Sequence, residues 1–159
     1  MTVRTESRIA IARSVRTVWT YVCDVGRWQE WAPTVRECWV VGGGPLESGS
    51  RLEQRAKGPL GSTHHRAQNV TEVEAPGRVA FAGTMVGSPA RWGMELDPMD
   101  DGRTDATMWV EVDRTAVLRA IPGRLLRRNI QRRHSAFFRC EYASSAGTSI
   151  ISAADPSGP

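Results

Sequence analysis

The amino-acid sequence predicts an α+β fold, in which a curved seven-stranded antiparallel sheet wraps around a long C-terminal helix and two short helices follow the first strand. Seven segments between residues 3 and 112 alternate polar and apolar side chains or are rich in β-branched residues. Turns rich in Gly, Pro and Asp separate the last six of them. The stretch 123–143 has no internal Gly or Pro and carries apolar residues at helical spacing, which predicts the long helix.

The first elements follow from local signals. Residues 3–11 alternate with period two, which predicts a half-buried strand. Ser14 is an expected N-cap for a helix that ends before Asp24. A second short helix is expected over 27–31, because Pro33 limits its C-terminal end. We expect Asp24 to cap this second helix.

The remaining strands form an antiparallel meander with short turns. They are expected at 35–41, 51–57, 62–74, 79–86, 90–96 and 104–112. Residues 1–143 would then form one domain, and 144–159, rich in Ser, Gly, Ala and Pro, would be a disordered tail. One helix does not fill a wide concave sheet, so an internal cavity for a small molecule is expected.

Composition narrows the class of protein. The chain has 159 residues, of which 40% are hydrophobic and 24% charged, as expected of one folded domain. No apolar run is long enough to span a membrane, and the first residues lack a secretory signal. Three widely spaced cysteines predict free thiols in a reducing, cytoplasmic compartment. The three histidines have no accompanying carboxylate cluster, so no metal site is expected.

Several motifs then point to a family. They are Val18-Trp19, Asp24, Trp28-x-x-Trp31-x-Pro33-x-Val35, Gly49, Pro59-Leu60-Gly61, the run from Val70 to Arg78, and the turn from Leu96 to Gly102. With these motifs and the arginine-rich last helix, residues 5–143 resemble the START-like (SRPBCC) superfamily, and most closely its polyketide cyclase/dehydrase subgroup. The resemblance implies a helix-grip fold with a hydrophobic cavity. None of the motifs is catalytic, so the resemblance specifies the fold more closely than the function.

The polar residues of the segment 62–74 are the first candidates for chemistry. If Val70 faces the interior, alternation brings Gln68 and Arg66 to the same face. His64 would follow them, and its neighbour His65 would face outward, unless a β-bulge reverses the order. An imidazole in a cavity can act as a general acid or base, and an arginine can stabilise an enolate or carboxylate oxygen. The alternative is a hydrogen-bonded polar lining without a catalytic role.

Tyr21, on the first predicted helix, is the third catalytic candidate beside His64 and Arg66. Its phenol could donate a proton to a carbonyl oxygen, and the alternative is packing with a solvated hydroxyl. Aromatic walls suit flat or polycyclic ligands, and methionines give a pocket an adaptable lining, although the same residues also serve as ordinary core. The candidate ligand-binding residues are Trp28, Trp31, Gln54, Gln68, Phe81, Met85, Trp92, Met94, Met108, Ile130 and His134.

The formal net charge of +4 is a local property. Residues 118–143 carry seven arginines and one glutamate, so the excess positive charge belongs to the predicted last helix. Such a face could bind an acyl carrier protein or another anionic partner, or be a solvated surface. Nucleic acid is disfavoured as a partner, because the helix lacks interleaved exposed aromatic residues. For the oligomeric state, the sequence is compatible with both a monomer and a homodimer.

Three functions are therefore considered. The first, which the resemblance favours, is a cofactor-free cyclase/aromatase or dehydratase acting on a polyketide or related aromatic intermediate. The second is a non-catalytic carrier or sensor of a lipid, quinone or polycyclic molecule, favoured by the small number of ionisable groups in the expected lining. The third is an interaction protein that uses the basic helix.

Overall fold

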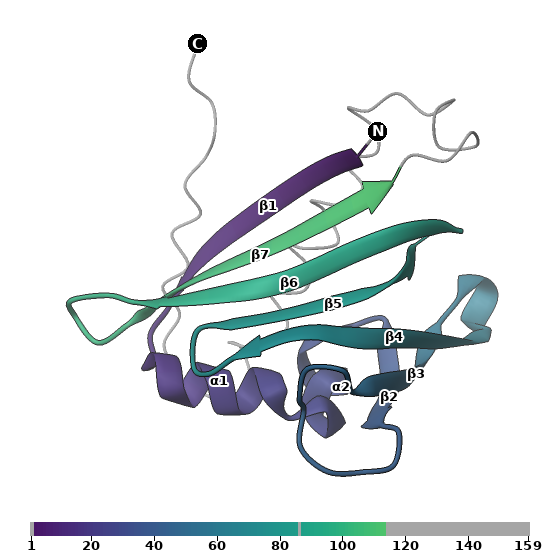
Figure 1. Cartoon of the computed structure of the whole chain (residues 1–159), viewed down its shortest axis with the longest axis horizontal. Helices are drawn as coiled ribbons and strands as arrows, with labels where there is room; N and C mark the ends of the chain where they lie inside the picture. The colour runs from purple at the N-terminus through teal and green to yellow at the C-terminus, as the bar shows by residue number, and fades with distance from the viewer. Residues whose placement is uncertain (1, 86, 114–159) are drawn as a thin grey trace.

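A computed structural model of the chain describes residues 2–85 and 87–113 (Figure 1). Its elements are β1 (Thr2–Ile11), α1 (Val15–Cys23), η1 (Val25–Arg27), α2 (Trp28–Trp31), β2 (Val35–Val40), β3 (Arg51–Lys57), η2 (Pro59–Gly61), β4 (Thr63–Glu74), β5 (Arg78–Met85), β6 (Ser88–Pro98) and β7 (Thr104–Asp113). The seven predicted strands and the two helical segments after the first strand are confirmed. The long helix expected at 123–143 and the tail at 144–159 lie outside the described residues.

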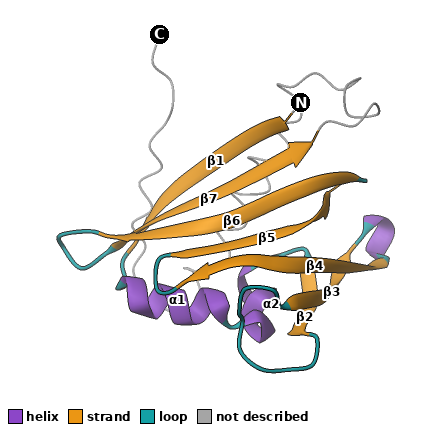
Figure 2. Cartoon of the chain, viewed as in Figure 1, coloured by secondary structure: helices purple, strands orange, loops and turns teal. Residues whose placement is uncertain are grey.

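The strands form one antiparallel sheet in the order β1-β7-β6-β5-β4-β3-β2 (Figure 2). Strands β2 to β7 follow one another as a meander, and β1 pairs with β7, where Val3 lies opposite Val112. β6 begins two residues earlier than predicted, because its hairpin with β5 pairs Met85 with Ser88. The hairpin is closed by Gly87, whose φ of 74° favours glycine.

The start of α1 confirms one of the two predicted helix caps. Ser14 Oγ accepts a hydrogen bond from the Thr17 amide at 3.4 Å. Asp24 precedes η1, but its carboxylate makes no capping hydrogen bond. Its backbone carbonyl accepts from the Arg27 amide at 3.0 Å instead. The predicted side-chain cap is therefore wrong, because the chain leaves α1 through a tight 3-10 turn that the backbone alone closes.

The two faces of the sheet differ in chemistry. The inner face packs on α1 and α2, which lie together beside one end of the sheet in Figure 1. Val18 of α1 and Trp28 of α2 share one buried cluster with Val79, Phe81 and Met94 of the sheet. This inner face carries the core, so the side chains available to a ligand inside the fold must come from it.

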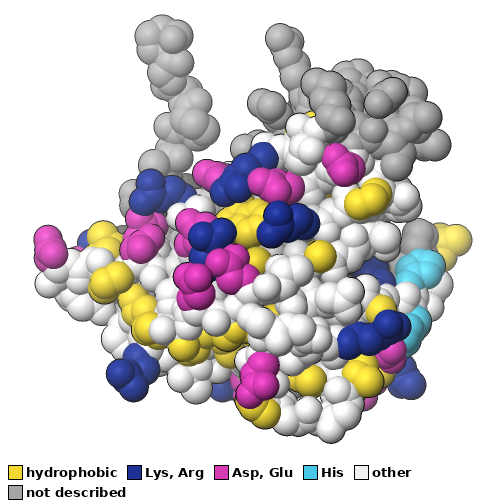
Figure 3. Space-filling model, viewed as in Figure 1, with side chains coloured by type: hydrophobic (Ala, Val, Ile, Leu, Met, Phe, Trp, Pro, Cys, Tyr) yellow, Lys and Arg dark blue, Asp and Glu magenta, His cyan; other side chains and the backbone are white. Residues whose placement is uncertain are grey.

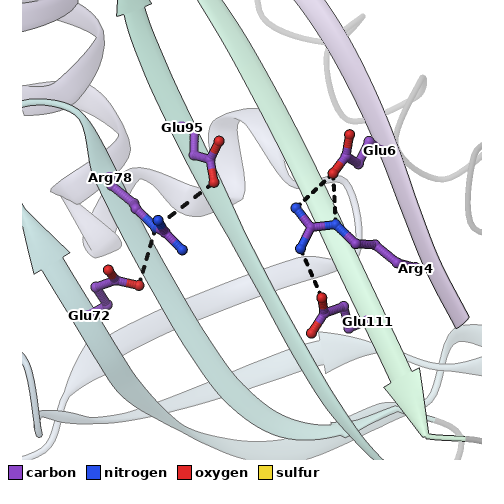
Figure 4. A network of polar contacts seen from close by, with 6 residues as sticks. All are labelled: Arg4, Glu6, Glu72, Arg78, Glu95 and Glu111. Atoms are coloured by element: carbon purple, nitrogen blue, oxygen red, sulfur yellow. Dashed lines mark hydrogen bonds and ion pairs between the residues drawn. The ribbon is translucent and has the colours of Figure 1, made fainter. Parts of the chain in front are cut away.

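The outer face is held by interleaved charges. Figure 4 shows Arg4 between Glu6, at 2.7 Å, and Glu111, at 2.8 Å. A second group joins three further strands, since Arg78 lies 3.2 Å from Glu72 and 3.9 Å from Glu95. Basic and acidic side chains alternate over this face in Figure 3. Each pair is partly exposed and contributes little stability by itself.

Candidate ligand-binding site

Three aromatic rings from three elements meet on the inner face. Phe81 of β5 and Trp92 of β6 are opposite each other in register and stack at 4.1 Å with 20° between their planes. Trp28 of α2 contacts both rings edge-on, at 5.4 Å and 5.5 Å. Trp31 lies 5.5 Å from Trp28 on the same helix. The predicted ligand-binding residues 28, 31, 81 and 92 thus form one cluster of flat aromatic rings.

The Trp28 ring is fixed by a hydrogen bond as well as by packing. Its Nε1 donates to the Val22 carbonyl at 2.8 Å. Val22 lies in the last turn of α1, where carbonyl groups lack partners within the helix. The same indole therefore closes the end of α1 and places its ring against Phe81 and Trp92.

The methionines lie on both sides of Trp92. Met94 and Met108 face each other across β6 and β7 and are buried in the main cluster. Met85 packs with Trp92 against a second cluster formed by Ala90, Val110 and Val112. Trp92 contacts both clusters, so its half-buried ring lies where the two apolar regions of the inner face meet.

A polar stripe runs along β3 and β4 beside the aromatic rings. Register places Arg66 opposite Gln54, and His64 opposite the fully buried Ala56. His64, Arg66 and Gln68 therefore share the inner face, as alternation predicts. His65 lies on the outer face, where its Nε2 is 3.2 Å from Glu53 Oε2.

The stripe changes from buried to exposed along β4. Gln68 and Gln54 are buried, whereas Arg66 and His64 are exposed. The pairing of β4 with β5 begins only at Asn69, so within the described residues the first half of β4 pairs with β3 alone. Figure 1 shows β4 and β5 diverging in this direction. Arg66 and His64 thus belong to the inner face but lie where the sheet has opened.

His64 packs on the β3–β4 connection. A Cβ atom built on Gly58 would lie 2.1 Å from His64 Nε2, so the imidazole occupies the space that a side chain at position 58 would need. The Gly58 amide donates to the Ser62 carbonyl at 2.8 Å and closes the loop. A glycine in this loop therefore allows His64 to lie at the edge of the inner face.

Tyr21 belongs to a different group of side chains. Its hydroxyl donates to Glu30 Oε2 at 2.9 Å, and the Arg27 guanidinium lies 4.4 Å above its ring. Arg27 also binds both carboxylate oxygens of Glu30. These hydrogen bonds, first from Arg27 and then from Tyr21, lower the pKa of Glu30. The structure thus brings Tyr21 to a carboxylate, and not only to the core against which its ring packs.

A hollow of about 760 Å³ opens at the β2 edge, between the helical segment and the sheet. Its lining residues are Gly26, Gln29, Arg36, Glu37, Cys38, Arg55 and Thr63. None of them is among the residues predicted from the sequence to contact a ligand. A register shift between Val35 and Glu37 distorts β2 here, and no local pattern signals such a bulge. Cys38 pairs with Gln54, so the hollow adjoins the polar stripe.

The two described cysteines are expected to react slowly with alkylating reagents. Burial raises the pKa of Cys23 to about 11 and that of Cys38 to about 12. Because the thiolate is the nucleophile, iodoacetamide at pH 8 should modify both at least about a hundredfold more slowly than a free thiol. Labelling should accelerate as the pH rises, with Cys23 ahead of Cys38. Peptide mapping by mass spectrometry measures this, and rapid modification at pH 8 would contradict it.

Some expected features fall outside the described residues. These are Ile130, His134 and the arginine-rich segment. Within residues 2–85 and 87–113, no helix is long and apolar enough to cross a membrane. The same residues contain no group of three His, Cys, Asp or Glu side chains that could hold a metal ion.

This arrangement defines the class of protein: a single antiparallel sheet carries aromatic and polar side chains on its inner face, and such a face is suited to a small molecule. A family model described as "Polyketide cyclase / dehydrase and lipid transport" matches residues 2–139. The chain belongs to this family. A search of curated proteins finds no match.

Solved structures agree on the fold. A protein of unknown function from Staphylococcus aureus has a TM-score of 0.72 at 12% identity, over 90% of this chain and 93% of that one. A START superfamily protein from Mycobacterium smegmatis has a TM-score of 0.67 at 14% identity, over 89% and 99%. The di-domain ARO/CYC StfQ from the steffimycin biosynthetic pathway has a TM-score of 0.69 at 14% identity, over 89% of this chain and 50% of that one. At these identities the similarity shows the fold alone.

Proposed function

We propose that the protein is a cofactor-free cyclase/aromatase or dehydratase that acts on a polyketide or related aromatic intermediate. The observation that carries the proposal is the placement of an aromatic cluster and a polar stripe on the same inner face of the sheet. The partly exposed ring of Trp92, which stacks on the buried Phe81, would hold the flat part of the substrate. The stripe that ends in Arg66 and His64 would meet its oxygen atoms.

The chemistry requires orientation and proton transfer. A base removes a proton from a carbon between two carbonyl groups, the resulting enolate carbon attacks another carbonyl carbon, and that carbonyl oxygen takes up a proton. Loss of water from the adduct then gives a double bond. Holding the chain in the reactive conformation supplies a large part of the rate. In this proposal His64 or a water molecule moves the protons, and Arg66 stabilises the enolate oxygen.

Tyr21 is also a candidate proton donor, but it already donates its proton to a carboxylate. Its hydroxyl donates to the Glu30 carboxylate, so it would have to leave that acceptor to protonate a substrate. We therefore propose His64 and Arg66 as the principal catalytic pair, with Tyr21 in a secondary role.

The test compares the turnover of variants at His64 and Arg66 with that of a control variant at the adjacent His65. Turnover of a synthetic poly-β-ketone thioester is followed by mass spectrometry, which detects the loss of water and the cyclised product. His64→Ala and Arg66→Ala should each lower the rate by about a hundredfold or more. His65→Ala is the matched control, because His65 lies on the outer face beside Glu53. Full turnover by His64→Ala and Arg66→Ala would overturn the assignment of these roles.

A carrier or sensor is the second candidate function. Among the described residues the buried polar side chains are Thr5, Gln54, Gln68, Ser88 and Thr104, and none of these is ionisable. An interior of this kind can hold a lipid, quinone or polycyclic molecule without changing it. Recovery of the bound molecule intact after long incubation with the wild-type protein would favour this function over the enzyme.

A further inference from the structure

Gln68 lies at the point where the sheet opens. Its side chain is on the inner face of β4 and only 7% exposed. The last β4–β5 pair, Asn69 with Ala82, is one residue away, and beyond it the two strands diverge (Figure 1). Gly83, the neighbouring position on β5, contributes no side chain, and a Cβ atom built there would lie only 3.3 Å from Gln68 Cβ. Gln68 is therefore buried, yet adjacent to a break in the sheet.

Trp92 fixes the orientation of the Gln68 amide. The indole Nε1 lies 3.2 Å from Gln68 Oε1. An indole N–H can only donate, so it requires the carbonyl end of the amide and not the NH₂ end. The NH₂ group must then point to the other side.

The other end of the amide has no partner among residues 2–85 and 87–113. Gln68 Nε2 is buried and makes no hydrogen bond to the described residues. A buried donor without an acceptor destabilises a folded protein, and natural proteins seldom leave one. Such a group gains most from a ligand that brings an acceptor.

We propose that Trp92 and Gln68 together form a binding site for a neutral carbonyl oxygen on a flat aromatic ligand. The ligand ring would pack on the partly exposed ring of Trp92, which stacks at 4.1 Å on the fully buried Phe81. Its carbonyl oxygen would accept a hydrogen bond from Gln68 Nε2. This inference rests on the proposed function and specifies the part of the substrate that the site selects.

The charges around Gln68 favour a ketone over a carboxylate. Its cross-strand neighbour Leu52 is fully buried, and Val70, next on the same face, is also buried. Arg66 is the nearest cationic residue along this face of β4, and its side chain is exposed. An ionised carboxylate at Gln68 would be buried without a close counter-charge, which is costly. A neutral ketone needs only the donor that Gln68 supplies.

A matched pair of probes tests the proposal. Fluorenone and fluorene are flat tricyclic molecules of nearly the same shape, and only fluorenone carries a carbonyl oxygen. Quenching of intrinsic tryptophan fluorescence gives both dissociation constants for the full chain. We expect fluorenone to bind about tenfold more tightly. Infrared spectroscopy should show its carbonyl stretch shifted to lower frequency in the complex.

Two variants locate the effect at Gln68. Gln68→Met keeps the length of the side chain but removes both polar groups, and should lose the preference for fluorenone while still binding fluorene. Gln68→Glu replaces the donor by an acceptor and should weaken fluorenone binding below that of fluorene. It also provides a second variant if Gln68→Met does not fold, and far-UV circular dichroism monitors folding in both.

The outcomes separate this inference from the proposed function. Equal binding of the two probes by the wild-type protein, or an unshifted carbonyl stretch, would overturn the Gln68 site and leave an aromatic-binding cavity in place. A preference for fluorenone that persists in Gln68→Met would also overturn it. Failure of both probes to bind would contradict the site and the proposed aromatic cavity together.

Discussion

Replacing Gly93 by alanine is expected to lower the free energy of unfolding by about 3 kcal/mol. A Cβ atom at position 93 would lie 2.6 Å from the Val79 carbonyl oxygen and 2.7 Å from Trp109 Cζ2. Both contacts are shorter than non-bonded atoms tolerate. The carbonyl belongs to the neighbouring strand and cannot turn away, so the strands β5 and β6 would have to separate.

The Trp109 ring adds to this effect. It lies on the outer face with the Arg4 guanidinium 5.0 Å from its centroid, and it is only 3% exposed. The missing side chain at Gly93 is what lets such a large ring lie flat on the sheet. With alanine at this position, the indole would be displaced from beneath Arg4 and its apolar surface would meet water.

Urea unfolding followed by far-UV circular dichroism measures the loss. Gly77→Ala is the matched control, because a Cβ atom there would meet only the Leu96 carbonyl oxygen at 3.6 Å and the Glu74 carbonyl oxygen at 4.0 Å. Its free energy of unfolding should stay within about 0.5 kcal/mol of the wild type. If Gly93→Ala were as stable as Gly77→Ala, the close packing of Trp109 on β6 would be disproved.

Local patterns predict most of the fold. Alternation over 104–112 correctly separates the inner residues Met108 and Val110 from the outer ones, because alternation depends only on the strand itself. Trp109 lies on the other, outer face of β7, between Thr107 and Glu111. It is buried because Gly93 lies opposite on β6 and Arg4 lies above the ring, and neither contact can be deduced without the register.

The sequence predicts which residues of the candidate site share a face of the sheet, but not how exposed each one is or which side chains it contacts. Alternation brought His64, Arg66 and Gln68 to one face, as observed. Their different exposure depends on the residue at which β4 stops pairing with β5, a property of two strands together. The hydrogen bond between Gln68 and Trp92 joins residues 24 positions apart and follows only from the assembled sheet.

Trp28→Ala is expected to cost about 3–5 kcal/mol, because truncating a buried tryptophan removes its packing and leaves a cavity. The side chain is 2% exposed and contacts the rings of Trp31, Phe81 and Trp92. Its loss would also leave the Val22 carbonyl without the donor that closes α1. Since native domains are stable by only about 5–15 kcal/mol, this variant should be largely unfolded at moderate urea concentrations.

Trp28→Phe separates the two contributions. Phenylalanine keeps an aromatic ring against Phe81 and Trp92 but cannot donate to the Val22 carbonyl, so a smaller loss of about 1–2 kcal/mol is expected. Urea midpoints of the two variants, measured by far-UV circular dichroism, give both values. Equal losses would mean that the hydrogen bond to α1 dominates and that the ring contributes little. A large difference is the expected result, because the ring of Trp28 is the contact through which α2 holds both Phe81 and Trp92 in place.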